Sequence, residues 1–172
     1  PLLDALAEIL ATAEELPETE VVPLELAVYR YCAVAVKSPI AVPPADNSAM
    51  DGYAVRSLET PAELPVSQRI PAGQPPRLLK SGTAARIFTG AEIPEGADAV
   101  VIQENTTAAD AQVHVLKQAN VGDHIRCAGE DVEPGQELLK KSQVIGPGEI
   151  AMLVAQGQTT ASVVKKPKVA IL

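Results

Sequence analysis

The strongest constraint on the fold is the frequency with which proline and glycine interrupt the chain between residues 38 and 134. Short apolar runs alternate there with turn residues, at residues 64–66, 75–79, 84–88, 99–102 and 113–115. Short Val, Ile and Leu runs cut by Pro and Gly are typical of a compact barrel or sandwich rather than of βαβ units. No strict Gly-x-Gly-x-x-Gly phosphate loop occurs, so the sequence predicts no dinucleotide-binding fold.

The flanking segments carry helical patterns. Leucine and isoleucine recur at three- and four-residue spacing from Leu2, which predicts an amphipathic helix to about Leu16, stopped by Pro17. We expect a second helix over residues 23–31 and a strand over residues 32–36. After a strand led by residues 138–139, Pro147 opens a helix that Gly157 caps, and residues 159–164 alternate like a strand.

These patterns predict an α+β fold that is mostly β. An amphipathic helix (residues 1–18) precedes a discontinuous helix and strand platform domain (residues 19–37 and 136–165). A compact β-domain, barrel- or sandwich-like, is inserted into the platform (residues 38–135). Residues 166–172 include an apolar run after Pro167, which we interpret as the start of a further domain.

Composition narrows the function classes. The net charge of −8 argues against a nucleic-acid partner, because binding to phosphates needs a basic stripe. No apolar run approaches the ~20 residues of a membrane span, and no signal peptide is visible. Cys32 and Cys127 form no metal-ligand spacing with either histidine, so we expect two small core residues in a reduced, cytoplasmic protein.

Three polar stretches are candidates for chemistry, and each also has a purely structural interpretation. Residues 43–56 form a turn-rich loop that presents Asp46 and Asp51, which turn chemistry alone explains. Thr89 beside a glycine could hold an oxyanion or could simply end a strand. Arg126 precedes Glu130 and Asp131, a pattern that fits either a surface ion pair or a cation that meets an anionic substrate.

Four ordered blocks resemble the molybdopterin molybdenumtransferases, the molybdenum insertases to which the insertase module of gephyrin is related. The blocks are residues 44–56, 71–74, 87–101 and 122–131. The match covers nearly the whole chain but only the amino-terminal domains I and II of that family. The sequence departs from the family at Tyr29, where a Gly usually precedes the arginine, and at Val34 and Ala35, where acidic residues are usual; these differences concern local packing.

The resemblance implies an enzyme of molybdenum cofactor biosynthesis. The family inserts molybdenum from molybdate into adenylylated molybdopterin and releases AMP, at a cleft between this β-domain and the third domain of the partner subunit in a homodimer. It implies that the first helix packs on that third domain, that a molybdopterin adenylyltransferase acts upstream, and that this chain supplies half of a composite site. The implied catalytic residues are Asp51, Thr89 and Asp131, with Asn47, Ser48 and Arg126 as substrate-binding residues.

The charges of these groups raise the question of a metal. Molybdate and a pterin phosphate are both negative, so carboxylates would repel them. Mg²⁺ typically takes one or two carboxylates plus phosphate oxygens and would polarise a phosphoanhydride. We therefore expect Asp51 and Asp131 to position Mg²⁺ or to accept a proton, while Thr89 and Arg126 contact the anion.

Two other functions stay open. A non-catalytic interaction scaffold, which gephyrin shows this module can host, would not need Asp51, Thr89, Arg126 and Asp131 to converge. A β-domain that binds a small molecule without chemistry would show an enclosed apolar pocket and no carboxylate pair.

Overall fold

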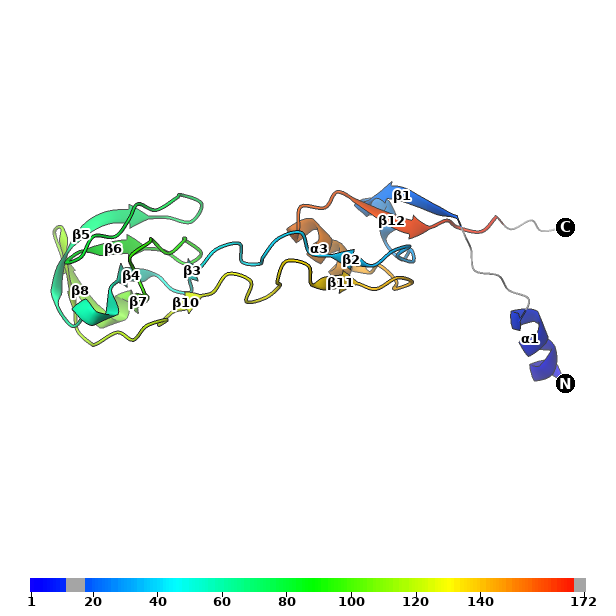
Figure 1. Cartoon of the computed structure of the whole chain (residues 1–172), viewed down its shortest axis with the longest axis horizontal. Coiled ribbons are helices and arrows are strands. Elements are labelled where there is room, and N and C mark those ends of the chain that lie inside the picture. Colours follow the sequence, from blue (N-terminus) through cyan, green and yellow to red (C-terminus); the bar gives the residue numbers. More distant parts are fainter. Residues whose placement is uncertain (12–17, 169–172) are drawn as a thin grey trace. The chain divides into compact units, whose positions relative to one another are not determined.

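The computed structural model describes residues 1–11 and 18–168, which fall into two compact units. One unit takes the described residues up to Pro39 and from Gly135 onward, and the other is Ile40–Pro134. The fold is mostly β with few helices, which confirms the predicted fold class (Figure 1). None of the described helices has the length and apolar character that a membrane span requires.

The first unit pairs strands from the two ends of the chain. Its antiparallel strands β1 and β12 run side by side, and β2 pairs with β11 (Figure 1). Its core gathers buried residues from both parts of the chain, among them Leu24, Cys32, Leu139, Leu153 and Val163. The elements are α1 (Leu2–Ala11), β1 (Thr19–Pro23), α2 (Leu24–Ala27), β2 (Val36–Lys37), β11 (Glu137–Leu139), α3 (Pro147–Ala155) and β12 (Thr160–Val164).

Helix α3 forms where the sequence predicts it. Pro147 occupies the first turn, where its missing N–H costs no hydrogen bond, and the Glu149 carboxylate accepts a hydrogen bond from the Gly146 N–H at 3.0 Å. Gly157 follows the helix at φ 75°, a left-handed conformation that glycine adopts without strain. The β12 prediction is confirmed as well.

The predicted helix and strand over residues 23–36 are largely wrong. Helix α2 stops at Ala27, and the residues after it bond across the unit instead: the Tyr29 N–H donates to the Ile145 carbonyl, and the Cys32 N–H to the Gln143 carbonyl. Tyr29 has φ 61°, a left-handed conformation that a bulky residue adopts only with strain. Glycine would fit there, which gives the departure from the family at this position a physical meaning.

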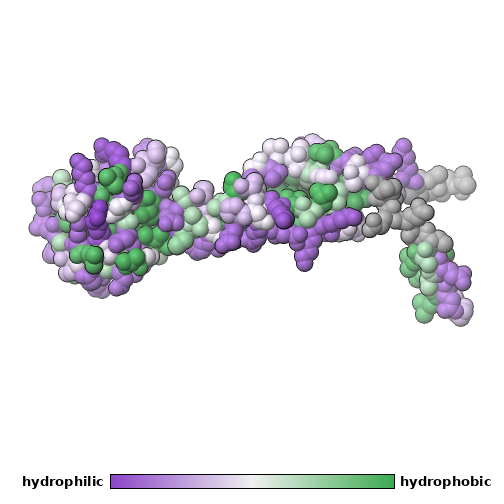
Figure 2. All heavy atoms as spheres, in the orientation of Figure 1, coloured by the Kyte–Doolittle hydropathy of each residue, from purple (hydrophilic) through white to green (hydrophobic). Residues whose placement is uncertain are grey.

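Helix α1 is amphipathic and wholly exposed. Its leucines and isoleucine gather on one side and its acidic residues on the other (Figure 2). Leu2 and Leu3 are 84% and 75% exposed. The predicted extension to Leu16 and the stop at Pro17 lie outside the described residues, as does most of the predicted apolar run at the carboxyl end.

The second unit is a curled six-stranded sheet with strand order β7-β4-β6-β5-β9-β8 (Figure 1). All of its neighbouring strands are antiparallel except β5 and β6. A short additional pair, β3 with β10, lies outside this sheet. The elements are β3 (Asn47–Ser48), β4 (Gly52–Val55), η1 (Ser57–Glu59), β5 (Glu63–Ile70), β6 (Ala84–Ile87), β7 (Ala99–Ile102), η2 (Gln103–Asn105), β8 (Thr106–Ala109), β9 (Gln112–Val115) and β10 (Ile125–Arg126).

Both faces of this sheet are apolar near its centre. Along β4, Tyr53 and Val55 belong to one buried cluster, while Ala54 belongs to the other. Successive side chains of a strand point to opposite faces, so β4 is buried on both sides. The cluster of Ala54 also holds Ile70 and Ile87, and this side supports the loops that carry the candidate site.

The apolar run at residues 75–79 is a loop rather than the predicted strand. Pro75 and Pro76 have no N–H to give to a neighbouring strand. The Gln68 side chain holds the loop instead, since it donates to the Arg77 carbonyl at 2.7 Å and accepts from the Arg77 N–H at 3.0 Å.

Candidate functional site

A short strand, β3, joins three of the motif stretches. Asn47 and Ser48 pair with β10, where Arg126 lies opposite Asn47. On its other side, the Ser48 N–H donates to the Ala91 carbonyl at 2.9 Å, and the Gly90 N–H donates to the Ser48 carbonyl at 2.8 Å. The turn-rich loop of residues 43–56 is therefore clamped between the Thr89 stretch and the Arg126 stretch.

Asp51 and Thr89 contact each other directly. The N–H and the hydroxyl of Thr89 both donate to Oδ1 of Asp51, at 2.9 and 2.8 Å. The antiparallel register of β4 and β6, with Gly52 opposite Ile87, brings these two residues together at the end of the sheet. The Thr89 donors that the sequence assigned to a ligand anion are thus engaged by the carboxylate of this same chain.

These contacts keep Asp51 ionised. The hydrogen bond from the Thr89 N–H, and next the bond from its hydroxyl, hold the pKa of the Asp51 carboxyl below its usual value. Within the described part of the chain, no residue donates a hydrogen bond to Oδ2 of Asp51. The site therefore presents a charged carboxylate with one oxygen fixed and the other open to a ligand.

Arg126 and Asp131 form a second pair. The Nη2 of Arg126 donates to Oδ2 of Asp131 at 2.7 Å, and its Nε lies 3.6 Å from a Glu130 carboxylate oxygen. The hydrogen bond and charge of Asp131, followed by the charge of Glu130, raise the pKa of Arg126 above its already high value. The positive charge predicted to meet a substrate anion is therefore balanced inside its own loop.

The weaker candidates Asn47 and Ser48 face different surroundings. Ser48 is 1% exposed, and its hydroxyl donates to the Met50 carbonyl at 2.6 Å. This hydroxyl shapes the loop and is not open to a ligand. Asn47 is half-buried and lines a pocket.

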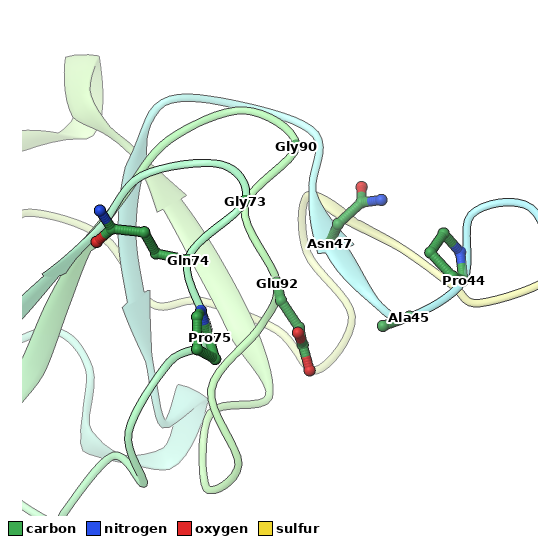
Figure 3. Close-up of a pocket in the computed structure, with 8 residues that line it drawn as sticks. All are labelled: Pro44, Ala45, Asn47, Gly73, Gln74, Pro75, Gly90 and Glu92. Atoms are coloured by element: carbon green, nitrogen blue, oxygen red, sulfur yellow. The ribbon is translucent and has the colours of Figure 1, made fainter.

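The pocket lies between three loops of the second unit and has a volume of about 320 Å³ (Figure 3). Gly73 and Gly90 bring backbone to its wall, and both have positive φ, at 81° and 78°. The Glu92 side chain and the Asn47 amide are polar groups of its lining (Figure 3). The lining is Pro44, Ala45, Asn47, Gly73, Gln74, Pro75, Gly90 and Glu92.

Sequence reasoning missed several of these residues as site residues. Gly73 and Gln74 belong to the 71–74 block, which the resemblance singled out without giving it a role. The signal was present, but only the fold shows that this loop faces Asn47 across the pocket (Figure 3). The expectation that Cys127 is a core residue is wrong, because its side chain is exposed in the loop that follows Arg126.

The donor set suits Mg²⁺ only in combination with a ligand. Among the residues that the structure describes, no group of three or more His, Cys, Asp or Glu side chains could hold a metal ion. Asp51 offers one open carboxylate oxygen, whereas Oδ2 of Asp131 already accepts from Arg126. Mg²⁺ often takes one or two protein carboxylates and completes its shell with phosphate oxygens and water, so these residues fit that mode of binding.

Comparisons with known proteins agree with one another. The protein-family description that matches is the MoeA N-terminal region (domain I and II), over residues 1–157. The molybdopterin molybdenumtransferase of Nostoc sp. (strain PCC 7120) is 40% identical over 162 residues, covering 90% of this chain and 37% of that protein. That of Staphylococcus aureus (strain Mu50) is 33% identical over 180 residues, covering 100% of this chain and 43% of that protein.

The crystal structure of the molybdopterin biosynthesis MoeA protein from Pyrococcus horikoshii OT3 has a TM-score of 0.90 and 36% sequence identity, and the match covers 97% of this chain and 46% of that one. The chain thus spans less than half the length of the relatives it matches. Since the family description covers most of the chain, the chain belongs to the MoeA N-terminal region family, domains I and II.

Proposed function

We propose that this chain is the amino-terminal part of a molybdopterin molybdenumtransferase that acts in molybdenum cofactor biosynthesis. The whole protein would insert molybdenum from molybdate into adenylylated molybdopterin and release AMP. The names of the relatives support this assignment. The chain would supply one half of the site, and a further domain from a partner subunit would supply the other.

The observation that carries the proposal is the clamped strand β3. It connects the Asp51–Thr89 pair to the Arg126–Asp131 pair, and Asn47 of the same strand lines the pocket. The Thr89 N–H donates to the carboxylate of Asp51, from which it is separated by 38 positions in the sequence. The Ala128 N–H donates to the carboxylate of Asp46, at a separation of 82 positions. Two stretches distant in the sequence, around Thr89 and around Arg126, therefore hold this loop in place.

The roles follow from the charges. Asp51 is ionised and has an open oxygen, so it can accept a proton or hold Mg²⁺, and Thr89 fixes its orientation. Arg126 orients Asp131 at the other end of β3. A bound Mg²⁺ would supply charge neutralisation for the phosphoanhydride; the chain's own residues place the carboxylates and shape the pocket beside them.

Three finer features belong to the same proposal. Mg²⁺ would be the cation, the working unit would be a homodimer, and a molybdopterin adenylyltransferase would deliver the adenylylated substrate in the cytoplasm. The pocket is compatible with a composite site, because all of its lining residues come from one unit (Figure 3).

Molybdenum insertion by a full-length protein that includes this chain tests the assignment. Asp51→Ala and Thr89→Ala should each lower kcat/KM by about 100-fold, since they remove the ionised carboxylate or the hydroxyl that helps to position it. Thr107→Ala is the matched control, because Thr107 is an exposed threonine of β8. Near-normal activity in both site variants would remove the assignment.

An interaction scaffold is the second candidate, and the exposed apolar side of α1 favours it (Figure 2). Variants of the site and of α1 distinguish the two functions. If the chain is a scaffold, Asp51→Ala and Thr89→Ala leave its function unchanged, and replacing Leu2, Leu3 and Leu6 by Ser abolishes it.

A further inference from the structure

Three side chains form a row across one face of the six-stranded sheet. Arg86 of β6 is registered with Tyr53 of β4 on one side and with Arg69 of β5 on the other. Residues in register on neighbouring strands point to the same face, so two arginines lie side by side. The row sits at the end of the sheet where Asp51 and Thr89 meet.

The ring of Phe88 holds both guanidinium groups. The Arg69 guanidinium carbon lies 4.4 Å from the centroid of the Phe88 ring, and that of Arg86 lies 4.8 Å from it. Arg86 also lies over Tyr53, at 5.1 Å. A guanidinium stacked on a ring loses rotational freedom, so both cations are held in defined positions before any ligand arrives.

The two arginines differ in their hydrogen bonds. Arg86 donates to the Gly52 carbonyl at 3.1 Å and to the Gln103 side chain at 2.9 Å, so part of its role is to fix the residue that follows Asp51. Within residues 1–11 and 18–168, the Arg69 side chain makes no hydrogen bond and neither arginine forms an ion pair with a carboxylate. Arg69 is exposed, with its donors directed to solvent or ligand.

The positive charges of Arg69 and Arg86 stand out in a chain whose net charge is negative. The chain carries eight more acidic than basic groups, yet within residues 1–11 and 18–168 neither of these two arginines forms an ion pair with a carboxylate; Arg86 attracts the Asp51 carboxylate only at longer range, where it helps to lower the pKa of Asp51. Like charges placed side by side repel, and an anion between or beside them removes that cost. Arg126, the arginine that the motif pattern favours, is by contrast neutralised by Asp131 and Glu130.

We propose that Arg69 and Arg86, held on the ring of Phe88, form a binding site for a tetrahedral oxyanion beside Asp51. A phosphate group and molybdate share this chemistry, and both occur among the substrates of the proposed function; the assignment of the site to that substrate depends on the proposed function, whereas the anion binding does not. Thr89 lies next to Phe88 in the chain, so the anion would lie close to the Asp51 carboxylate. A cation held by that carboxylate and by the anion would join the two.

Titration of the ¹⁵N-labelled chain with inorganic phosphate, and in a parallel arm with molybdate, tests the site at low ionic strength. We expect saturable shifts of the Arg69 and Arg86 Nε–H signals. Arg69→Gln and Arg86→Gln should each weaken binding about tenfold or more, since each removes a charged donor. Arg77→Gln is the matched control, because Arg77 is an exposed arginine on a neighbouring loop whose guanidinium donates to a backbone carbonyl. The anion that binds more tightly, phosphate or molybdate, is then identified as the ligand of the site.

Arg69→Gln is the decisive variant, because the Arg69 side chain makes no hydrogen bond within the described residues and its loss should leave the backbone amide spectrum unchanged outside its neighbours. The proposal is overturned if neither anion binds, if Arg69→Gln binds as tightly as Arg77→Gln, or if the shifts centre on Arg126. If the unmodified full-length protein binds the anion but does not insert molybdenum, that result would instead count against the proposed function alone.

Discussion

At the scale of single residues, the carboxylates of the site accept hydrogen bonds from other residues of the same chain. Thr89 spends both of its donors on one oxygen of Asp51, and Arg126 is tied to Asp131. Among the described residues, none donates a hydrogen bond to Oδ2 of Asp51, and the Arg69 guanidinium donates to none of them. Under the two proposals above, Arg69 and Arg86 would meet an anionic substrate, while Asp51 would serve a metal or a proton.

Thr89→Val should raise the pKa of Asp51, because it removes the hydroxyl hydrogen bond and keeps the backbone one. A carboxylate with a lowered pKa adds stability that is present at neutral pH and lost as the pH falls through its folded-state pKa. The stability difference between the wild type and Thr89→Val should therefore shrink in acid. The ¹³C shift of the Asp51 carboxyl group measures the pKa directly, and Thr107→Val should leave it unchanged.

At the scale of elements, strand β4 connects the core to the site. It pairs with β6 and β7 and is buried on both faces, and Asp51 precedes it directly. Gly52 lies against the backbone of β7: a Cβ placed on it would come within 2.0 Å of the Val101 carbonyl oxygen. The glycine is required by this contact between backbones.

Gly52→Ala should destabilise the sheet unit by about 3 kcal/mol, because a backbone carbonyl cannot give way as a side chain can. Gly148→Ala offers the contrast, since that glycine is in helix α3 with open space around its added Cβ, and the change should stabilise the first unit by up to ~1 kcal/mol. Urea unfolding followed by amide signals of each unit measures both. Equal stabilities for Gly52→Ala and the wild type would contradict the packing described for β4.

The elements also show what sequence alone can predict. Strand β7 and the start of α3 follow from local patterns, an apolar run and a proline at the first turn, and both are confirmed. Residues 23–36 were mispredicted because their backbone bonds to Gln143 and Ile145, more than a hundred residues away in the chain. The Asp51–Thr89 contact depends on the β4–β6 register, and Phe88 gains its role only when β5 sets Arg69 beside Arg86.

At the scale of the whole molecule, every candidate site residue lies in the unit Ile40–Pro134. The chain corresponds to less than half of its relatives, and the pocket of the sheet unit is open, so we infer that catalysis needs a further domain to complete the site. Under the proposed function, this part would hold the carboxylates and the oxyanion group, and the remaining domain would bring the pterin.

We propose that Asp51 and Asp131 serve one ligand, and a double-mutant cycle tests this proposal most directly. In a full-length protein, kcat/KM for molybdenum insertion would be measured for Asp51→Asn, Asp131→Asn and the double variant. Residues that share a ligand give non-additive losses, whereas independent sites give additive ones. We predict that the double variant loses far less than the product of the two single losses; a loss equal to that product would contradict a shared site.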